Sequence, residues 1–172
     1  KYIATQTSAR NSGVIHAGIY YSPKSLKAKL CVRGKNLLYE YCEKFNVPHL
    51  RTKKMIVATT SGETEILLKL KDTATKNGLE LEFISGQAAI EREPNLFAVS
   101  ALVSPTTGIV DASKLAASFL HQAEINGAIL ALETKITNIT QASKILVSGT
   151  SGGEKFETEF DILINACGHG AH

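Results

Sequence analysis

The stretch QTSARNSGVIHAGIYY, residues 6–21, holds most of the chemically distinctive side chains of this sequence. Gly13 and Gly18 interrupt it, and neither a helical nor an alternating strand pattern runs through it. Glycine tolerates positive φ and lets another group approach the backbone closely. A helix that began near Ser12 would direct unpaired backbone N–H groups outward, which favours an anion such as phosphate. We therefore expect an anion-binding loop that leads into a helix.

His16 is the side chain of this stretch best suited to move a proton at neutral pH. A structural role is the alternative, since a lone histidine in a glycine-rich loop often serves only the fold. Ser12 is equally explained as a plain helix N-cap. Packing or an interface would also account for Tyr20 and Tyr21. From the residues alone, a catalytic role for His16 stays one of two interpretations.

Composition indicates a soluble globular protein of about one domain, with 172 residues, 44% of them hydrophobic and 20% charged. The formal net charge of +3 is too small, and its lysines and arginines too scattered, to indicate a nucleic-acid partner. No apolar run approaches the roughly 20 residues of a membrane span, and no signal peptide pattern opens the sequence. We therefore expect no integral membrane segment.

The three cysteines fit a reducing compartment inside the cell, either the cytoplasm or the mitochondrion. Cys31 and Cys42 fall in one predicted helix, about 16 Å apart along its axis, which is beyond disulfide reach. Cys167 ends an apolar run. No cysteine pair has zinc-ligand spacing, so we expect no metal site and interpret the thiols as buried packing residues.

Helical and strand patterns alternate along the chain, which predicts an α/β or mixed α+β fold. An amphipathic helix of about twenty residues follows Ser22, with Leu26, Leu30, Leu37, Tyr41 and Phe45 on its apolar stripe. A second helix is expected at 61–78, with Ile66, Leu70 and Ala74 on one face, and a short helical turn within 85–96. A further helix is expected after the N-cap Asp111, with Leu115, Phe119, Leu120 and Ala123 facing inward. Strands are expected at 54–59, 81–84, 99–104, 128–132, 144–148, 155–160 and 161–166.

The last of these strands, DILINA at 161–166, has the continuous apolar pattern of a strand buried on both faces. It breaks into NACGHG, as α/β folds do where backbone meets a cofactor at the carboxyl end of a sheet. An ordinary strand-to-turn junction is an equal alternative. Residues 1–50 and 110–172 would form one layered unit, with 51–109 as an excursion. The chain lacks an initial Met and stops inside a motif-like segment, so we expect it to be part of a longer protein.

Four segments together resemble one family, and the similarity extends over essentially the whole chain. They are TQTSARNSGVIHAGIYYSPKSLKAKLCVRGKNLLYEYC at 5–42, REPNL at 92–96, SPTTGIVDASKLAASFLHQAEINGA at 104–128 and ILINACG at 162–168. These segments are similar to the FAD-dependent oxidoreductases of the D-amino-acid-oxidase-like superfamily, and in particular to its L-2-hydroxyglutarate dehydrogenase/oxidase branch. RNSGVIHAGIYY is the most specific of the matching strings.

The resemblance implies a Rossmann-like FAD-binding domain, partly present as 1–50 and 110–172, interrupted by the first portion of a mixed-sheet substrate domain at 51–109. It implies FAD as cofactor. The residues expected beside it are Thr7, Ser8, Arg10, Asn11, Ser12, Gly13, Ile136, Asn165, Ala166 and Gly168. The family's GxGxxG segment would precede Lys1, and the portion that completes the flavin site would follow His172. We therefore expect the 172-residue piece alone to bind FAD weakly or not at all.

The reaction implied is oxidation of a 2-hydroxy acid, above all L-2-hydroxyglutarate to 2-oxoglutarate, with hydride transfer to flavin N5. His16 becomes the expected base, and Arg10 and Tyr20 the expected substrate contacts. An amino acid or glycerol phosphate is the alternative substrate, and a truncated, non-catalytic relative is the alternative class of protein. The electron acceptor stays open among oxygen, a quinone at a membrane surface and an electron-transfer flavoprotein.

Overall fold

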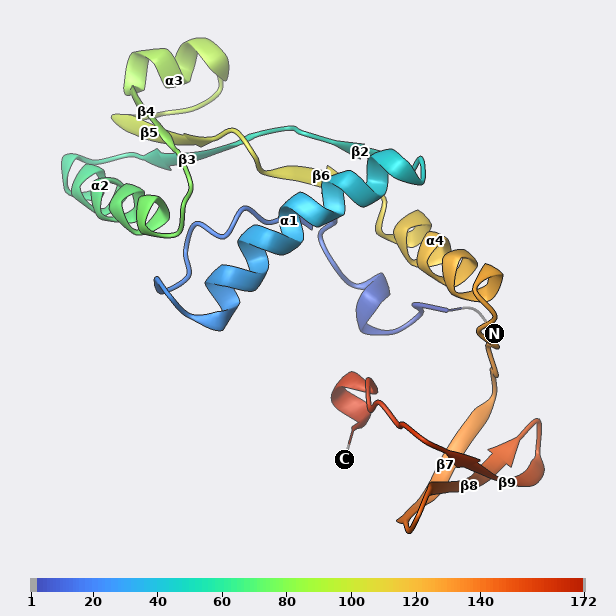
Figure 1. Cartoon of the computed structure of the whole chain (residues 1–172). Helices are drawn as coiled ribbons and strands as arrows, with labels where there is room; N and C mark the ends of the chain where they lie inside the picture. Colours follow the sequence, from blue (N-terminus) through green and yellow to red (C-terminus); the bar gives the residue numbers. More distant parts are fainter. Residues whose placement is uncertain (1–2, 172) are drawn as a thin grey trace. The chain divides into compact units, whose positions relative to one another are not determined.

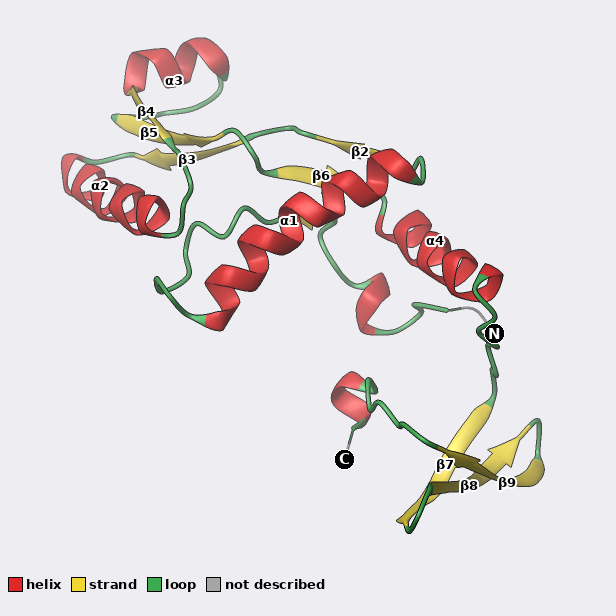
Figure 2. Ribbon diagram, in the orientation of Figure 1, coloured by secondary structure: helices red, strands yellow, loops and turns green. Residues whose placement is uncertain are grey.

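The computed structural model describes residues 3–171 and has a mixed α/β fold, in agreement with the predicted fold class. Residues 3–120 and 121–171 form two compact units, each described below by itself (Figures 1 and 2). The extreme ends of the predicted FAD-binding segments, residues 1–2 and 172, lie outside the described residues.

Two three-stranded antiparallel sheets organise the N-terminal unit, in the orders β1-β6-β2 and β3-β5-β4. The strands of the first sheet are β1 (Val14–Ile15), β2 (His49–Leu50) and β6 (Gly108–Val110). Those of the second are β3 (Lys54–Ala58), β4 (Glu82–Ser85) and β5 (Ser100–Ser104). The whole second sheet thus falls within the predicted excursion at 51–109, and β2 and β6, which flank it in the sequence, pair with each other. The assignment of these segments to an FAD-binding and a substrate domain stays a prediction.

Helices connect and cover these sheets, and each begins at a polar side chain that accepts a backbone N–H of its first turn. They are α1 (Leu26–Lys44), α2 (Ser61–Lys76), α3 (Gly86–Arg92) and α4 (Ala112–Ile125), capped by Ser25, Thr60, Ser85 and Asp111. The predicted cap at Asp111 is confirmed, since its Oδ1 accepts the Lys114 N–H at 2.9 Å. None of the helices in residues 3–171 is both long and apolar enough to cross a bilayer.

The core lies on both faces of the second sheet, where α2 and α3 cover opposite sides (Figure 2). Leu102 of β5 packs with Leu67 and Ala74 of α2, whereas its neighbours Ala101 and Val103 pack with α3. This is the alternation expected of a strand buried between two layers. The α2 cluster also holds Ala17 and Ile19, so the segment around His16 is anchored in the core.

The apolar stripes predicted for α1 and α4 are wrong as a guide to burial. Leu26, Leu30 and Leu37 are at least half exposed, and no residue of α4 is buried. The buried residues of α1 are Ala28, Lys35, Tyr39 and Cys42. On α2 the buried leucine is Leu67, while Ile66 is exposed. Periodicity identifies the apolar face of a helix, but burial requires a partner surface. The two stripes meet only in part, where the Tyr41 ring of α1 lies 4.6 Å from the Phe119 ring of α4, and this contact leaves the rest of both stripes exposed.

The N-terminus of α2 is closed by a reciprocal capping box between Thr60 and Glu63. Glu63 Oε2 accepts the Thr59 N–H at 2.6 Å, the Thr59 hydroxyl at 2.8 Å and the Thr60 N–H at 3.2 Å. These hydrogen bonds hold the pKa of the Glu63 carboxyl below its ordinary value of 4.5, and the bond from the Thr59 N–H has the largest effect. A carboxylate with a lowered pKa stabilises the fold above its ordinary pKa, and this contribution is lost as the pH falls through the lowered value.

Glu63→Gln should therefore lower the thermal midpoint of the complete protein at neutral pH, and the difference from wild type should shrink once the pH drops below 4.5. Midpoints measured across that range test the prediction. Glu65→Gln is the matched control, because the Glu65 side chain lies on the same helix and makes no hydrogen bond or ion pair to any described residue. A pH-independent difference for Glu63→Gln would contradict the capping role of the carboxylate.

Three antiparallel strands form the C-terminal unit, β7 (Thr134–Gln141), β8 (Ile145–Ser151) and β9 (Glu154–Phe160), in that order. The strands predicted at 144–148 and 155–160 are confirmed as β8 and β9, which form a hairpin with Gly152 and Gly153 in the turn at positive φ. The strand predicted at 128–132 is wrong, because the strand lies at 134–141, where a segment rich in β-branched residues pairs with β8. An apolar run becomes a strand only where another strand supplies its hydrogen bonds.

The same reason accounts for residues 161–166, where the predicted buried strand is absent from the structure. Ile162 and Ile164 are 77% and 82% exposed, and the β7-β8-β9 sheet ends at Phe160. Cys167, predicted to be a buried packing residue, is likewise exposed, whereas Cys42 is buried and Cys31 half-buried.

Candidate active site

Strand register places His16 beside the turn that precedes β6. Ile15 is paired with Gly108 in the antiparallel β1-β6 ladder, so the next residue, His16, lies across from Thr107. Ile15 and Ala17 on either side of it are buried, whereas the His16 side chain is exposed. The backbone is thus held by its neighbours, and the imidazole is left free to meet a ligand.

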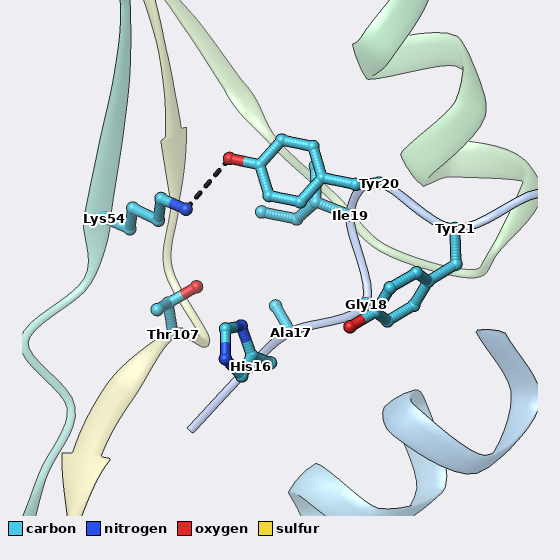
Figure 3. A pocket seen from close by; sticks show the side chains of 8 residues that line it. All are labelled: His16, Ala17, Gly18, Ile19, Tyr20, Tyr21, Lys54 and Thr107. Atoms are coloured by element: carbon cyan, nitrogen blue, oxygen red, sulfur yellow. Dashed lines mark hydrogen bonds between the residues drawn. The ribbon is translucent and has the colours of Figure 1, made fainter. Parts of the chain in front are cut away.

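The imidazole faces a shallow pocket that is open to solvent (Figure 3). The residues that line it are His16, Ala17, Gly18, Ile19, Tyr20, Tyr21, Lys54 and Thr107. None of these carries a carboxylate, and Lys54 supplies a cation. Residues 3–171 hold no cluster of three or more His, Cys, Asp or Glu side chains that could bind a metal. The pocket therefore offers a proton acceptor, hydroxyl groups and a positive charge.

The segment 16–21 is fixed to α1 and α2 by hydrogen bonds and close packing. Asn77, at the end of α2, donates from Nδ2 to the carbonyls of Gly18 and Tyr21 at 3.2 and 2.8 Å. Cys31 Sγ lies 3.4 Å from the His16 carbonyl oxygen. Gly18 has φ of +98°, and a Cβ there would lie 3.0 Å from Val32 Cγ2. Glycine is required at this turn for its conformation and for its contact with α1.

Thr107, which lines the pocket opposite His16, is held in place by hydrogen bonds to Ser104 and Lys53. Its hydroxyl lies 2.8 Å from the Ser104 hydroxyl, and both residues are buried. Its carbonyl accepts the Lys53 N–H at 2.9 Å. The preceding carbonyl, that of Thr106, accepts the Tyr39 hydroxyl at 3.2 Å. Burial raises the pKa of Tyr39, which keeps this phenol protonated and able to donate.

Sequence reasoning missed Lys54, Thr107 and Asn77 as residues of this site. Asn77 lies near the end of the helix predicted at 61–78, and no role is predicted for Thr107 from the sequence. A charged residue at the start of the apolar strand KMIVA was the available signal for Lys54. Tyr20 was predicted to contact substrate, and it does line the pocket, where its side chain is 51% exposed.

The predicted helix at Ser12 is wrong. The structure has a short 3₁₀ turn, Thr7–Ala9, followed by a loop and β1. Asn11 Oδ1 accepts the Gly13 N–H at 2.7 Å, and Asn11 Nδ2 donates to the Ser8 carbonyl. These local bonds offer the backbone an alternative to helix. Gly13, with φ of +66°, then turns the chain into the β1-β6 pairing.

Arg10 stabilises that turn from its side chain. Its Nη1 donates to the carbonyls of Thr5 and Gln6 at 3.2 and 3.0 Å. The guanidinium therefore has protein acceptors already, in an exposed position. Its predicted contact with FAD or with substrate stays a prediction.

The loop around Ser12 has the donor groups that phosphate oxygens require, which fits the FAD pyrophosphate. The hydroxyls of Thr7, Ser8 and Ser12 are exposed and make no hydrogen bond to any residue in the described chain. The backbone N–H groups of Asn11 and Ser12 are likewise unpaired within residues 3–171. Hydroxyl and backbone N–H donors on one short loop suit an anionic group.

The remaining predicted cofactor contacts lie in the C-terminal unit. Ile136 is half-exposed on β7, opposite Gly149 of β8. Asn165 Oδ1 accepts the Cys167 N–H at 3.1 Å, and Gly168, at φ of +55°, begins a second 3₁₀ turn, Gly168–Gly170. Ala166 lies between them and is exposed. That these residues meet the same cofactor as the loop around Ser12 stays a prediction.

Comparison with known proteins gives a consistent family assignment. The family model DAO, described as FAD dependent oxidoreductase, matches residues 1–172. An L-2-hydroxyglutarate dehydrogenase of Arabidopsis thaliana, described as mitochondrial, is 47% identical over 119 residues, which are 69% of this chain and 25% of that protein. The Homo sapiens protein of the same name is 35% identical over 172 residues, covering 93% of this chain and 37% of its own length. The chain thus spans well under half the length of these relatives.

Two solved structures share the fold. The L-alpha-glycerophosphate oxidase of Mycoplasma pneumoniae, solved with FAD bound, superposes with a TM-score of 0.79 at 30% identity, over 85% of this chain and 40% of that one. The glycine oxidase of Geobacillus kaustophilus superposes with a TM-score of 0.76 over 90% of this chain and 43% of that one. The identity of the second pair is 23%, so this likeness concerns the fold alone.

Proposed function

The chain belongs to the DAO family of FAD-dependent oxidoreductases, and from that premise we propose that the complete protein oxidises a 2-hydroxy acid, with L-2-hydroxyglutarate as its substrate. The relatives named L-2-hydroxyglutarate dehydrogenase, at 35% and 47% identity, support this choice of substrate. The observation that carries the proposal is His16, which projects into an open pocket from a backbone fixed on both sides.

His16 is the proposed base of the reaction. A ring nitrogen of its imidazole takes the proton of the substrate C2 hydroxyl, which lets the C2–O bond become a carbonyl as the C2 hydrogen leaves. The hydrogen bonds from Asn77 to the carbonyls of Gly18 and Tyr21 hold the segment that carries this imidazole in place. The protein thus contributes mainly position and proton transfer.

FAD, when bound, supplies the two-electron acceptor for the hydride that leaves C2. The hydroxyls of Thr7, Ser8 and Ser12 and the N–H groups of Asn11 and Ser12 are the proposed contacts of its pyrophosphate. Further residues are proposed to contact FAD. They are Gly13 and, in the C-terminal unit, Ile136, Asn165, Ala166 and Gly168.

The proposed domain arrangement keeps 51–109 as part of a substrate domain inserted into an FAD-binding domain. The self-contained second sheet supports it, because its three strands all come from that range. The proposed location is a reducing compartment, cytoplasmic or mitochondrial, in line with relatives described as mitochondrial. Oxygen, a quinone and an electron-transfer flavoprotein stay the candidate acceptors of the electrons.

Anaerobic mixing of the FAD-loaded complete protein with candidate substrates tests the function. We expect L-2-hydroxyglutarate to bleach the flavin absorbance, and its D-enantiomer, glycerol 3-phosphate and glycine to leave it unchanged. Bleaching by glycerol 3-phosphate or glycine, but not by L-2-hydroxyglutarate, would reassign the substrate within the family. A flavin that no compound of this panel reduces would favour the non-catalytic alternative.

A further inference from the structure

Lys54 is a half-buried cation that lines the His16 pocket without a carboxylate partner among residues 3–171. Its Nζ donates to the Tyr20 hydroxyl at 2.9 Å and lies 4.8 Å from the centre of the Tyr20 ring (Figure 3). A positive charge in a pocket without acidic side chains favours an anionic ligand.

The position of Lys54 follows from the junction between the two sheets. Lys54 is the first residue of β3 and pairs with Ser104, the last residue of β5. The preceding residue, Lys53, binds the Thr107 carbonyl through its N–H, and Thr107 in turn bonds to Ser104 through its hydroxyl. The ammonium group is therefore carried by backbone that is tied to the same turn as His16.

Donor groups remain available on both members of the pair. An ammonium has three donors, and Lys54 uses one of them on Tyr20, which leaves two. The Tyr20 hydroxyl accepts that bond, so its own proton is free to donate. A carboxylate accepts several hydrogen bonds at its two oxygens, and bonds from a charged donor are the strongest of this kind.

We propose that Lys54 and Tyr20 form the site that binds a carboxylate of the substrate, and that they give the pocket its preference for a dicarboxylic 2-hydroxy acid. This inference rests on the proposed function and names the residues that select its substrate. Lys54 supplies the charge, Tyr20 adds a second donor and orients the ammonium, and His16 reaches the hydroxyl of the same bound molecule.

Binding of glutarate, which lacks a hydroxyl and is not oxidised, tests the site independently of turnover. Titration calorimetry on the FAD-loaded complete protein would compare wild type with Lys54→Met and Tyr20→Phe. We expect Lys54→Met to weaken glutarate binding about 10- to 100-fold. Tyr20→Phe should weaken it less, about 3- to 10-fold, because only a neutral hydroxyl is removed. Lys54→Arg should recover part of the loss.

Lys27→Met is the matched control. Lys27 also lies over a tyrosine ring, 4.7 Å from the centre of Tyr21, but it is exposed and does not line the pocket. Its replacement should leave glutarate binding unchanged. Glutarate affinity that is equal in wild type and Lys54→Met, or an equal loss in Lys27→Met, would overturn the proposal.

Turnover then identifies which carboxylate is bound. KM for L-2-hydroxyglutarate and for its 5-amide, which lacks the distal charge, would be measured in wild type and Lys54→Met. A rise confined to L-2-hydroxyglutarate assigns Lys54 to the distal carboxylate. A rise for both assigns it to the carboxylate next to the hydroxyl and would overturn its role in the preference for a dicarboxylic acid. Absence of turnover in a wild-type protein that still binds glutarate through Lys54 would overturn the proposed function and leave the carboxylate site in place.

Discussion

Replacement of His16 with asparagine in the FAD-loaded complete protein should lower kcat for L-2-hydroxyglutarate about 10²- to 10⁴-fold. Asparagine keeps a polar side chain of similar reach but cannot take up the hydroxyl proton. The fold should not change, because the His16 side chain is exposed and the buried neighbours Ile15 and Ala17 provide the packing. The contact of Cys31 with this residue uses its backbone carbonyl, which the substitution retains.

Anaerobic single-turnover flavin reduction measures the effect on the chemical step, and the flavin absorbance of the purified variant reports its FAD content. His121→Asn is the matched control, since His121 is an exposed histidine on α4 and lines no part of the pocket. Its kcat should equal that of wild type. A His16→Asn protein that reduces its flavin within a few-fold of the wild-type rate would rule out His16 as the base, and loss of bound FAD would assign His16 to cofactor binding.

The features predicted correctly from sequence are those that local chemistry determines. Asp111 caps α4 because a side-chain acceptor placed just before a helix satisfies a free N–H, wherever the helix packs. The helix predicted at 61–78 ends at Asn77 and Gly78 for a similar reason. The tight turn at Gly152 and Gly153 joins the strands predicted at 144–148 and 155–160. Each of these features depends on residues within a few positions of one another.

The features that sequence reasoning missed depend on contacts between distant segments. The pairing of Ile15 with Gly108 brings His16 to Thr107, and no spacing within either segment encodes it. Lys54 enters the pocket by the same kind of long-range register, through Ser104. For residues 161–166 the sequence predicted a strand that the structure lacks. Their composition is that of a strand, but a strand forms only where another strand supplies its hydrogen bonds.

Gly108→Ala should destabilise the complete protein by about 3 kcal/mol, at the upper end of what overpacking usually costs. A Cβ at Gly108 would lie 2.2 Å from the Tyr39 hydroxyl and 2.4 Å from the Leu50 carbonyl oxygen. Tyr39 is almost fully buried, and Leu50 is held in β2 by its pairing with β6, so neither group can withdraw easily. To admit the methyl group, β6 must shift away from β2.

A shift of β6 would also move the register partner of Ile15, so Gly108→Ala should reduce flavin reduction by L-2-hydroxyglutarate as well as the thermal midpoint. Gly62→Ala provides the control, because a Cβ at Gly62 meets no atom within 4 Å and the residue lies in the exposed first turn of α2. Its effect on stability should stay within about 0.5 kcal/mol. A wild-type midpoint for Gly108→Ala would show that the close packing of β6 against Tyr39 and Leu50 is absent, and with it the means by which the first sheet positions His16.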